Sequence, residues 1–156
     1  MYLYIYLFIL FINYNQNNEN KVVSDVLDNL HKYASQANGE LYFDLFNDNA
    51  IFFGTDAKER WDKKAFQDYA LERFNIGDGW TYYPISRNIY FNVDKNTAWF
   101  DEELKNEKYG VFRGTGVLTK QNNVWKINQY NLLLPIPNEL LIKYSKEIKT
   151  FLDDND

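Results

Sequence analysis

Residues 97–138 decide the fold, and they read TAWFDEELKNEKYGVFRGTGVLTKQNNVWKINQYNLLLPIPN. Apolar and polar residues alternate along three segments, 97–105, 109–120 and 124–134, which the polar turns NEK and QNN separate. Alternation with a period of two indicates strands, and short turns between them indicate antiparallel hairpins. This part of the chain therefore predicts three consecutive antiparallel strands, which end at the prolines of PIP because proline cannot continue a sheet.

The region before these strands is predicted to be mostly helical. Apolar residues recur at steps of three and four over residues 21–37, and Asp62 is a good N-cap for a later helix. In chain order, we predict helices at 21–37 and 40–46, a strand at 50–54 after the turn 47–49, a helix from 62 to 76, a strand at 80–93 kinked at Pro84, the three strands above, and a helix after Asn138. Helices segregated on one face of an antiparallel sheet define the α+β class.

The N-terminus is predicted to be separate from this domain. Residues 2–12 (YLYIYLFILFI) are continuously apolar, and the chain then turns abruptly polar. The run is short for a bilayer span and matches the apolar region of a signal peptide. We predict residues 1–20 to be a signal peptide or apolar segment, residues 21–152 to be one domain, and the protein to be exported. An uncleaved anchor, a strand and a start codon placed too early are the alternatives, and the protein is cytoplasmic if the run is not a signal.

Composition excludes several classes of function. The 156 residues suffice for one domain, and 19% of them are aromatic, which supplies bulky walls for a core or a cavity. A net charge of -5 disfavours a nucleic-acid partner, because such partners select clustered basic residues. The chain has no cysteine and a single histidine, His31, so we predict no metal site and no cofactor. His31 is expected at the flank of the first helix, beside its apolar stripe.

Several blocks in a fixed order resemble the nuclear-transport-factor-2-like superfamily, and within it a functionally uncharacterised subgroup of the SnoaL-like branch. The blocks are GTDAKERW (54–61), WTYYP (80–84), RNIYF (87–91), TAWFDE (97–102), RGTGVL (113–118) and WKINQYNLLLPIPN (125–138). The resemblance implies a cone-shaped, strongly bent sheet wrapped around N-terminal helices, with a pocket at the wide end. Some members are isomerases, cyclases or dehydratases, and others only bind ligands or dimerise. Fold alone does not transfer a reaction.

Asp101 and Glu102 are the candidate acid/base residues. Alternation places Glu102 on the more apolar face of its strand, and Asp101 on the other. A buried carboxyl group can act as a general acid or base near neutral pH. The competing interpretation is a cross-strand ion pair with Arg113, which lies opposite Glu102 in one register and opposite Asp101 after a slip of one residue.

The remaining candidates are ligand contacts. Gln129 and Asn131 continue the face of Trp125 and Ile127, so we expect them to be buried, where they either orient a ligand or bridge strands. Apolar pocket walls are expected from three further aromatic side chains, namely Trp61, Tyr82 and Trp99.

Together these features predict binding of a small, largely apolar molecule. The sequence leaves open whether acid/base chemistry without a cofactor accompanies binding. In such a reaction Asp101 or Glu102 would transfer the proton, and Arg113 would stabilise an oxyanion. The alternative is a non-catalytic exported binding or dimerisation domain, a homodimer through the outer sheet face. Contact with a membrane is expected only through the N-terminal segment, if it is uncleaved.

Overall fold

A computed structural model describes the backbone of residues 2–155 and the side chains of residues 18–155. In chain order the elements are α1 (Tyr2–Ser35), α2 (Gly39–Asp44), β1 (Phe46–Phe53), β2 (Arg60–Asp62), α3 (Lys63–Phe74), β3 (Tyr83–Phe91), β4 (Thr97–Asn106), β5 (Gly110–Gln121), β6 (Val124–Leu133) and α4 (Asn138–Asp153). The predicted α+β class is confirmed, with the helices α1, α2 and α3 preceding the four long strands.

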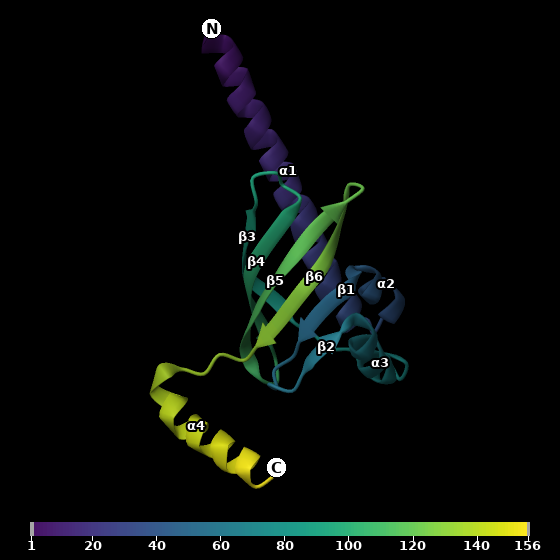
Figure 1. Cartoon of the computed structure of the whole chain (residues 1–156), viewed down its shortest axis with the longest axis vertical. Coiled ribbons are helices and arrows are strands. Elements are labelled where there is room, and N and C mark those ends of the chain that lie inside the picture. The colour runs from purple at the N-terminus through teal and green to yellow at the C-terminus, as the bar shows by residue number, and fades with distance from the viewer. Residues whose placement is uncertain (1, 156) are drawn as a thin grey trace.

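The strands form one curved sheet in the order β2-β1-β6-β5-β4-β3 (Figure 1). Strands β3 to β6 are joined by antiparallel pairings, as the alternating sequence predicts. Strand β1 pairs with β6 in parallel, so the sheet is antiparallel with one parallel pair. This pairing brings residues near position 50 beside residues near position 130 and closes the sheet around the helices.

Helix α1 begins well before the predicted residue 21. The sequence contains no glycine or proline between residues 2 and 38, so no residue there breaks a helix. Figure 1 shows its N-terminal part projecting beyond the sheet. The predicted signal segment lies mostly among residues 1–17, whose side chains are outside the described residues, and export stays a prediction. Within the described part, none of the helices combines the length and apolar character needed to cross a bilayer.

The core lies between the sheet and the first three helices. Val23, Leu27, Leu30 and Ala34 form the buried stripe of α1, as their spacing predicts. Phe66 of α3 is 2% exposed and stacks on Phe52 of β1 with 3.8 Å between ring centroids. Burying each large apolar side chain contributes roughly 1.5–3 kcal/mol, so these contacts hold the helices inside the curve of the sheet.

Two local predictions are wrong. Residues 47–49, predicted as a turn, lie within β1. Instead of a turn, the pairing of β1 with β6 has a register shift between Phe46 and Ile51. Residues 60 and 61, which lie between the predicted strand and the predicted helix, form with Asp62 the edge strand β2 against the end of β1. In both cases pairing with a neighbouring strand outweighs local turn propensity. The N-cap prediction is confirmed, because the Asp62 side chain accepts a hydrogen bond from the backbone N–H of Ala65 (2.8 Å).

Helix α4 is the exception to the packing. Its predicted apolar positions are present, but none of its described residues is buried. Figure 1 shows it standing apart from the sheet, beyond the end at which β6 finishes. A groove lies between α4 and the loop after β1. The fold of residues 18–133 therefore does not depend on α4.

Candidate functional site

The carboxylate of Glu102 is buried inside the curve of the sheet, with 1% of the residue exposed. Its Oε1 atom lies 2.9 Å from His31 Nε2 and accepts a hydrogen bond from the Tyr130 hydroxyl (2.8 Å). Its Oε2 atom accepts a hydrogen bond from Arg87 Nε (2.8 Å). An unpaired buried charge costs several kcal/mol, so these partners are what makes an ionised carboxylate tolerable there. The sequence prediction that Glu102 faces inward is confirmed.

Arg87 reaches Glu102 because β3 contains one extra residue. The register of the β3–β4 pair shifts at Ile85, and this bulge places Arg87 directly opposite Glu102 on the same face. Its Nη1 atom donates hydrogen bonds to Ser24 Oγ (2.9 Å) and to the Asp28 carboxylate (2.7 Å). Nη2 lies 2.8 Å from Glu102 Oε2, but its N–H groups are not aligned for a hydrogen bond. The arginine thus joins α1 to the sheet.

The protonation of His31 follows from its partner. An ionised carboxylate only accepts hydrogen bonds, so His31 Nε2 carries the proton that faces Glu102. The other ring nitrogen, Nδ1, forms no hydrogen bond to any described residue. In the neutral ring Nδ1 holds a free lone pair, so it can take up a proton. Glu102 fixes the tautomer and the orientation of a potential acid/base group.

The electrostatics favour an ionised Glu102 beside a protonated Tyr130. Burial raises the pKa of Glu102, but the hydrogen bonds and charges of His31 and Arg87 outweigh it and hold that pKa below its usual value. Burial, followed by the negative charge of Glu102, raises the pKa of Tyr130 well above its usual value. Tyr130 therefore stays a hydrogen-bond donor across the physiological range.

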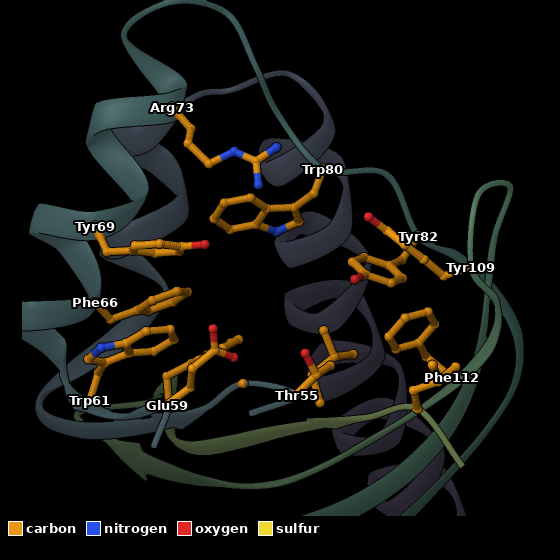
Figure 2. Close-up of a pocket in the computed structure, with 14 residues that line it drawn as sticks. Thr55, Glu59, Trp61, Phe66, Tyr69, Arg73, Trp80, Tyr82, Tyr109 and Phe112 are labelled. Atoms are coloured by element: carbon orange, nitrogen blue, oxygen red, sulfur yellow. The ribbon is translucent and has the colours of Figure 1, made fainter. Parts of the chain in front are cut away.

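A pocket of about 470 Å³ opens at the wide end of the cone. Figure 2 shows side chains from α3, from the segment leading into β3 and from the β4–β5 turn surrounding the same space. Most of the side chains that line it are aromatic: Phe52, Trp61, Phe66, Tyr69, Trp80, Tyr82, Tyr109 and Phe112. The volume lies within the usual range of about 300–1,000 Å³ for small-molecule sites.

A small separate cavity of about 20 Å³ lies next to the buried polar group. It is lined by His31 and Tyr130, and it shares Phe52, Trp80 and Tyr82 with the larger pocket. This volume suits about one water molecule. Glu102 lines neither space, so it can influence a bound molecule only through His31 or Tyr130.

The rim of the pocket contains an acidic side chain, Glu59, in the loop between β1 and β2. The backbone N–H of Asp56 donates a hydrogen bond to Glu59 Oε2 (3.1 Å). Gly54 leaves room for this carboxylate, because a Cβ atom at position 54 would overlap it. Asp56 accepts a hydrogen bond from the backbone N–H of Lys58 (2.8 Å), which adds a second contact within the loop.

A basic side chain, Arg73 of α3, lies across the rim. Its guanidinium group is 5.7 Å from the ring centroid of Trp80 and donates to Asp78 through Nε (3.0 Å) and Nη2 (2.7 Å). Arg73 is therefore already paired with a carboxylate outside the pocket lining. Among the described residues, no group of three or more histidine or acidic side chains is arranged to hold a metal ion.

The predicted pairing of Arg113 with Glu102 or Asp101 is wrong. Arg113 pairs with Glu103 in the β4–β5 register, one residue away from Glu102 and two away from Asp101, and it is exposed on the outer face. Asp101 also faces outward, where it accepts a hydrogen bond from Asn88 Nδ2 (2.9 Å). The inward charge pair is therefore Glu102 with Arg87.

The predicted burial of Gln129 and Asn131 is also wrong. The β5–β6 register shifts so that Asn128 is an extra residue, which reverses the alternation along β6. Beyond this bulge Tyr130 turns inward, Gln129 is exposed and Asn131 is only half-buried. Trp99 is 45% exposed on the outer face and stacks on Tyr90, so it does not line the pocket.

Trp61 and Tyr82 do line the pocket, at the positions that the sequence predicts. The sequence reasoning missed His31, Arg87 and Tyr130. One signal for His31 was present in the sequence. It follows Leu30 directly and Asp28 by three residues, so it lies at the border of the apolar stripe of α1. The inward positions of Arg87 and Tyr130 depend on β-bulges. A bulge reverses which side chains of a strand point inward, and the alternation of apolar and polar residues does not reveal it.

A family model described as the SnoaL-like domain matches residues 23–137. Among curated proteins, no sequence matches this chain. The matched range begins within α1 and ends just before α4, so it includes the pocket and the group around Glu102.

Solved structures with the same fold have little sequence identity to this chain. A protein with a cystatin-like fold from Caulobacter vibrioides has a TM-score of 0.67 and 8% identity, covering 81% of this chain and 99% of that one. An NTF2-like protein of unknown function from Pseudomonas putida has a TM-score of 0.66 and 9% identity, covering 80% and 91%. A candidate scytalone dehydratase from Novosphingobium aromaticivorans has a TM-score of 0.64 and 14% identity, covering 78% and 87%. These similarities show the fold alone.

Proposed function

The chain belongs to the SnoaL-like domain family, and we propose that it binds a small, largely apolar molecule in its aromatic pocket, with His31 as a proton acceptor or donor. The observation that supports this most directly is that the cavity at His31 shares lining residues with the pocket, namely Phe52, Trp80, Tyr82 and Leu132. A bound molecule that extends into the small cavity would meet the one described imidazole of the chain.

The binding half of the proposal rests on the pocket lining. Aromatic rings supply large apolar contact area at low entropic cost, and the few polar groups at the rim give orientation. The pocket is open at one end, so a ligand can enter without a change in the sheet. The family likeness supports this reading, since the fold is shared by binding domains and enzymes.

The acid/base half rests on the pair of His31 and Glu102. The carboxylate orients the ring, and Nδ1 has no hydrogen-bond partner among the described residues. Such a pair can move a proton next to a carbonyl group, and a water molecule in the small cavity can stabilise the oxygen. No cofactor is needed for this step. In this proposal Glu102 is a positioning residue for His31.

Binding is tested with the neutral fluorescent probe N-phenyl-1-naphthylamine. We expect its fluorescence to rise on addition of the protein, and Thr55→Trp at the rim to weaken the effect by narrowing the mouth. Lys58→Trp is the matched control, because Lys58 belongs to the same loop but does not line the pocket. Equal loss of signal in both variants, or no signal with the wild type, would count against the pocket as a binding site.

Acid/base activity is tested by deuterium exchange at the α-carbon of 2-tetralone in D₂O, followed by NMR. We expect the wild-type protein to accelerate exchange and His31→Gln to abolish the acceleration. Glutamine can still donate to Glu102, so the variant keeps the fold. If the wild type and His31→Gln exchange equally, the acid/base half fails and the binding half stands on the probe experiment.

The second candidate function is dimerisation, and the outer sheet face favours it. Trp99 and Tyr90 stack there with 6.0 Å between ring centroids, and each is 45% exposed. Large exposed aromatic side chains are enriched at interfaces. Gel filtration of the protein is expected to show a dimer that Trp99→Ser weakens. A monomer at high concentration would remove this candidate.

A further inference from the structure

We infer that the ligand of this pocket is an organic cation: an ammonium group attached to an apolar body, with the charge directed at Glu59. The inference rests on the proposed binding function and adds the chemical class of the ligand. It is derived from the one pocket-lining charge that has no counter-charge within the described part of the chain.

The loop between β1 and β2 holds Glu59 in a position from which its carboxylate can contact a ligand. The loop backbone closes on itself through hydrogen bonds from Gly54 N–H to the Glu59 carbonyl (2.9 Å) and from Glu59 N–H to the Asp56 carbonyl (3.0 Å). Only Oε2 of the carboxylate accepts a hydrogen bond from a described residue. Figure 2 shows the carboxylate of Glu59 pointing into the space between the aromatic side chains. Oε1 is therefore free to accept from a ligand.

The charge balance of the lining favours a cation. Arg73 is paired with Asp78, whereas Glu59 forms no ion pair with any described residue. Its sequence neighbour Arg60 points elsewhere and lies 5.8 Å from the ring centroid of Phe53. Glu59, Arg73 and Asp78 together therefore leave one negative charge at the mouth.

The aromatic walls favour the same class of ligand. Trp61, Phe66 and Tyr69 form a stacked column next to Glu59, with 5.8 Å between the first two rings and 5.0 Å between Trp61 and Tyr69. The stacked faces are turned toward one another, so this column supplies apolar contact for the body of the ligand. Arg73 over Trp80 already shows one cation held against this wall. A carboxylate beside several rings selects an ammonium group over a neutral group of the same shape.

The test compares two probes of nearly identical shape by quenching of intrinsic tryptophan fluorescence. Benzyltrimethylammonium has the positive charge, and neopentylbenzene replaces the nitrogen with carbon. We expect the cation to bind at least about tenfold more tightly at low salt, since each factor of ten corresponds to about 1.4 kcal/mol. This comparison uses the wild-type protein and needs no variant.

Two variants assign the preference to Glu59. Glu59→Gln is expected to lower the affinity for the cation about tenfold and to leave the affinity for the neutral probe unchanged. Glu72→Gln is the matched control, because Glu72 is exposed on α3 and does not line the pocket. Equal affinities of the two probes, or an unchanged cation affinity in Glu59→Gln, would overturn the cation inference and leave the binding function intact. Failure of both probes to bind would overturn both.

Discussion

The change of Glu102 to glutamine tests whether the buried polar group stabilises the fold. Glutamine keeps the shape of the side chain and removes its charge. All the groups around Glu102 are donors: His31 Nε2, the Tyr130 hydroxyl and Arg87 Nε. An amide offers one acceptor oxygen and one donor NH₂ group, so its neighbours are satisfied only if His31 and Tyr130 change from donors to acceptors. The guanidinium group of Arg87 would also lose its buried counter-charge.

The expected loss of stability follows from these contacts. Removing one partner of a buried ion pair costs about 3–5 kcal/mol. The glutamine oxygen still accepts one hydrogen bond, and Arg87 keeps its ion pair with Asp28 at 2.7 Å, so the loss falls at or just below the lower end of that range. We expect about 2–3 kcal/mol, which lowers the Tm by about 5–10 °C in a domain of this size.

The measurement is urea unfolding followed by circular dichroism, with thermal unfolding as a second readout. Glu103→Gln is the matched control, because Glu103 is the next residue on the same strand and is exposed on the outer face. We expect this control to change the free energy of unfolding by less than about 0.5 kcal/mol. A loss below about 1 kcal/mol for Glu102→Gln would refute the reasoning. It would mean that the attraction between Glu102 and Arg87 does not outweigh the cost of removing their charges from water.

The pH dependence gives an independent check of the same residue. The pKa of Glu102 is lower in the folded protein than in the unfolded chain, whose value is about 4.3. Its contribution to stability is therefore complete above about pH 4.3 and is lost as the pH falls through the lower folded pKa. We expect the stability difference between wild type and Glu102→Gln to be largest near pH 6 and to shrink below about pH 4. A difference that is constant over this range would contradict the assignment.

Three further predictions concern the fold and the site. Gly114→Ala places a methyl group against the Tyr130 hydroxyl and Glu102, so we expect a loss of about 1–3 kcal/mol in urea unfolding, and an unchanged stability would be the contrary result. Phe66→Ala removes a ring that is 2% exposed, so we expect a loss of about 3–5 kcal/mol by the same assay. Deletion of residues 138–156 is expected to change the free energy of unfolding by less than about 0.5 kcal/mol, because α4 buries none of its described residues; a cooperative loss of structure would contradict this.

The sequence determined the fold class and the inward face of β4. Alternating residues between 97 and 105 place Glu102 among Ala98, Phe100 and Leu104, all of them buried in the structure. Such patterns are local, because each strand residue faces opposite to its neighbours whatever the partner strand is. The family resemblance, stated from short blocks, agrees with the matched SnoaL-like domain. Trp61 and Tyr82, which were expected as apolar walls, do line the pocket.

The partners of Glu102 were decided only by the tertiary structure. The extra residue in β3 brings Arg87 opposite Glu102, and the extra residue in β6 turns Tyr130 inward in place of Gln129. His31 comes from a helix 71 residues earlier in the chain. A bulge shifts the register by one residue, and one residue is enough to exchange the inner and outer faces of a strand. Sequence alternation therefore identified the buried carboxylate, and the packing of three distant segments decided which side chains surround it.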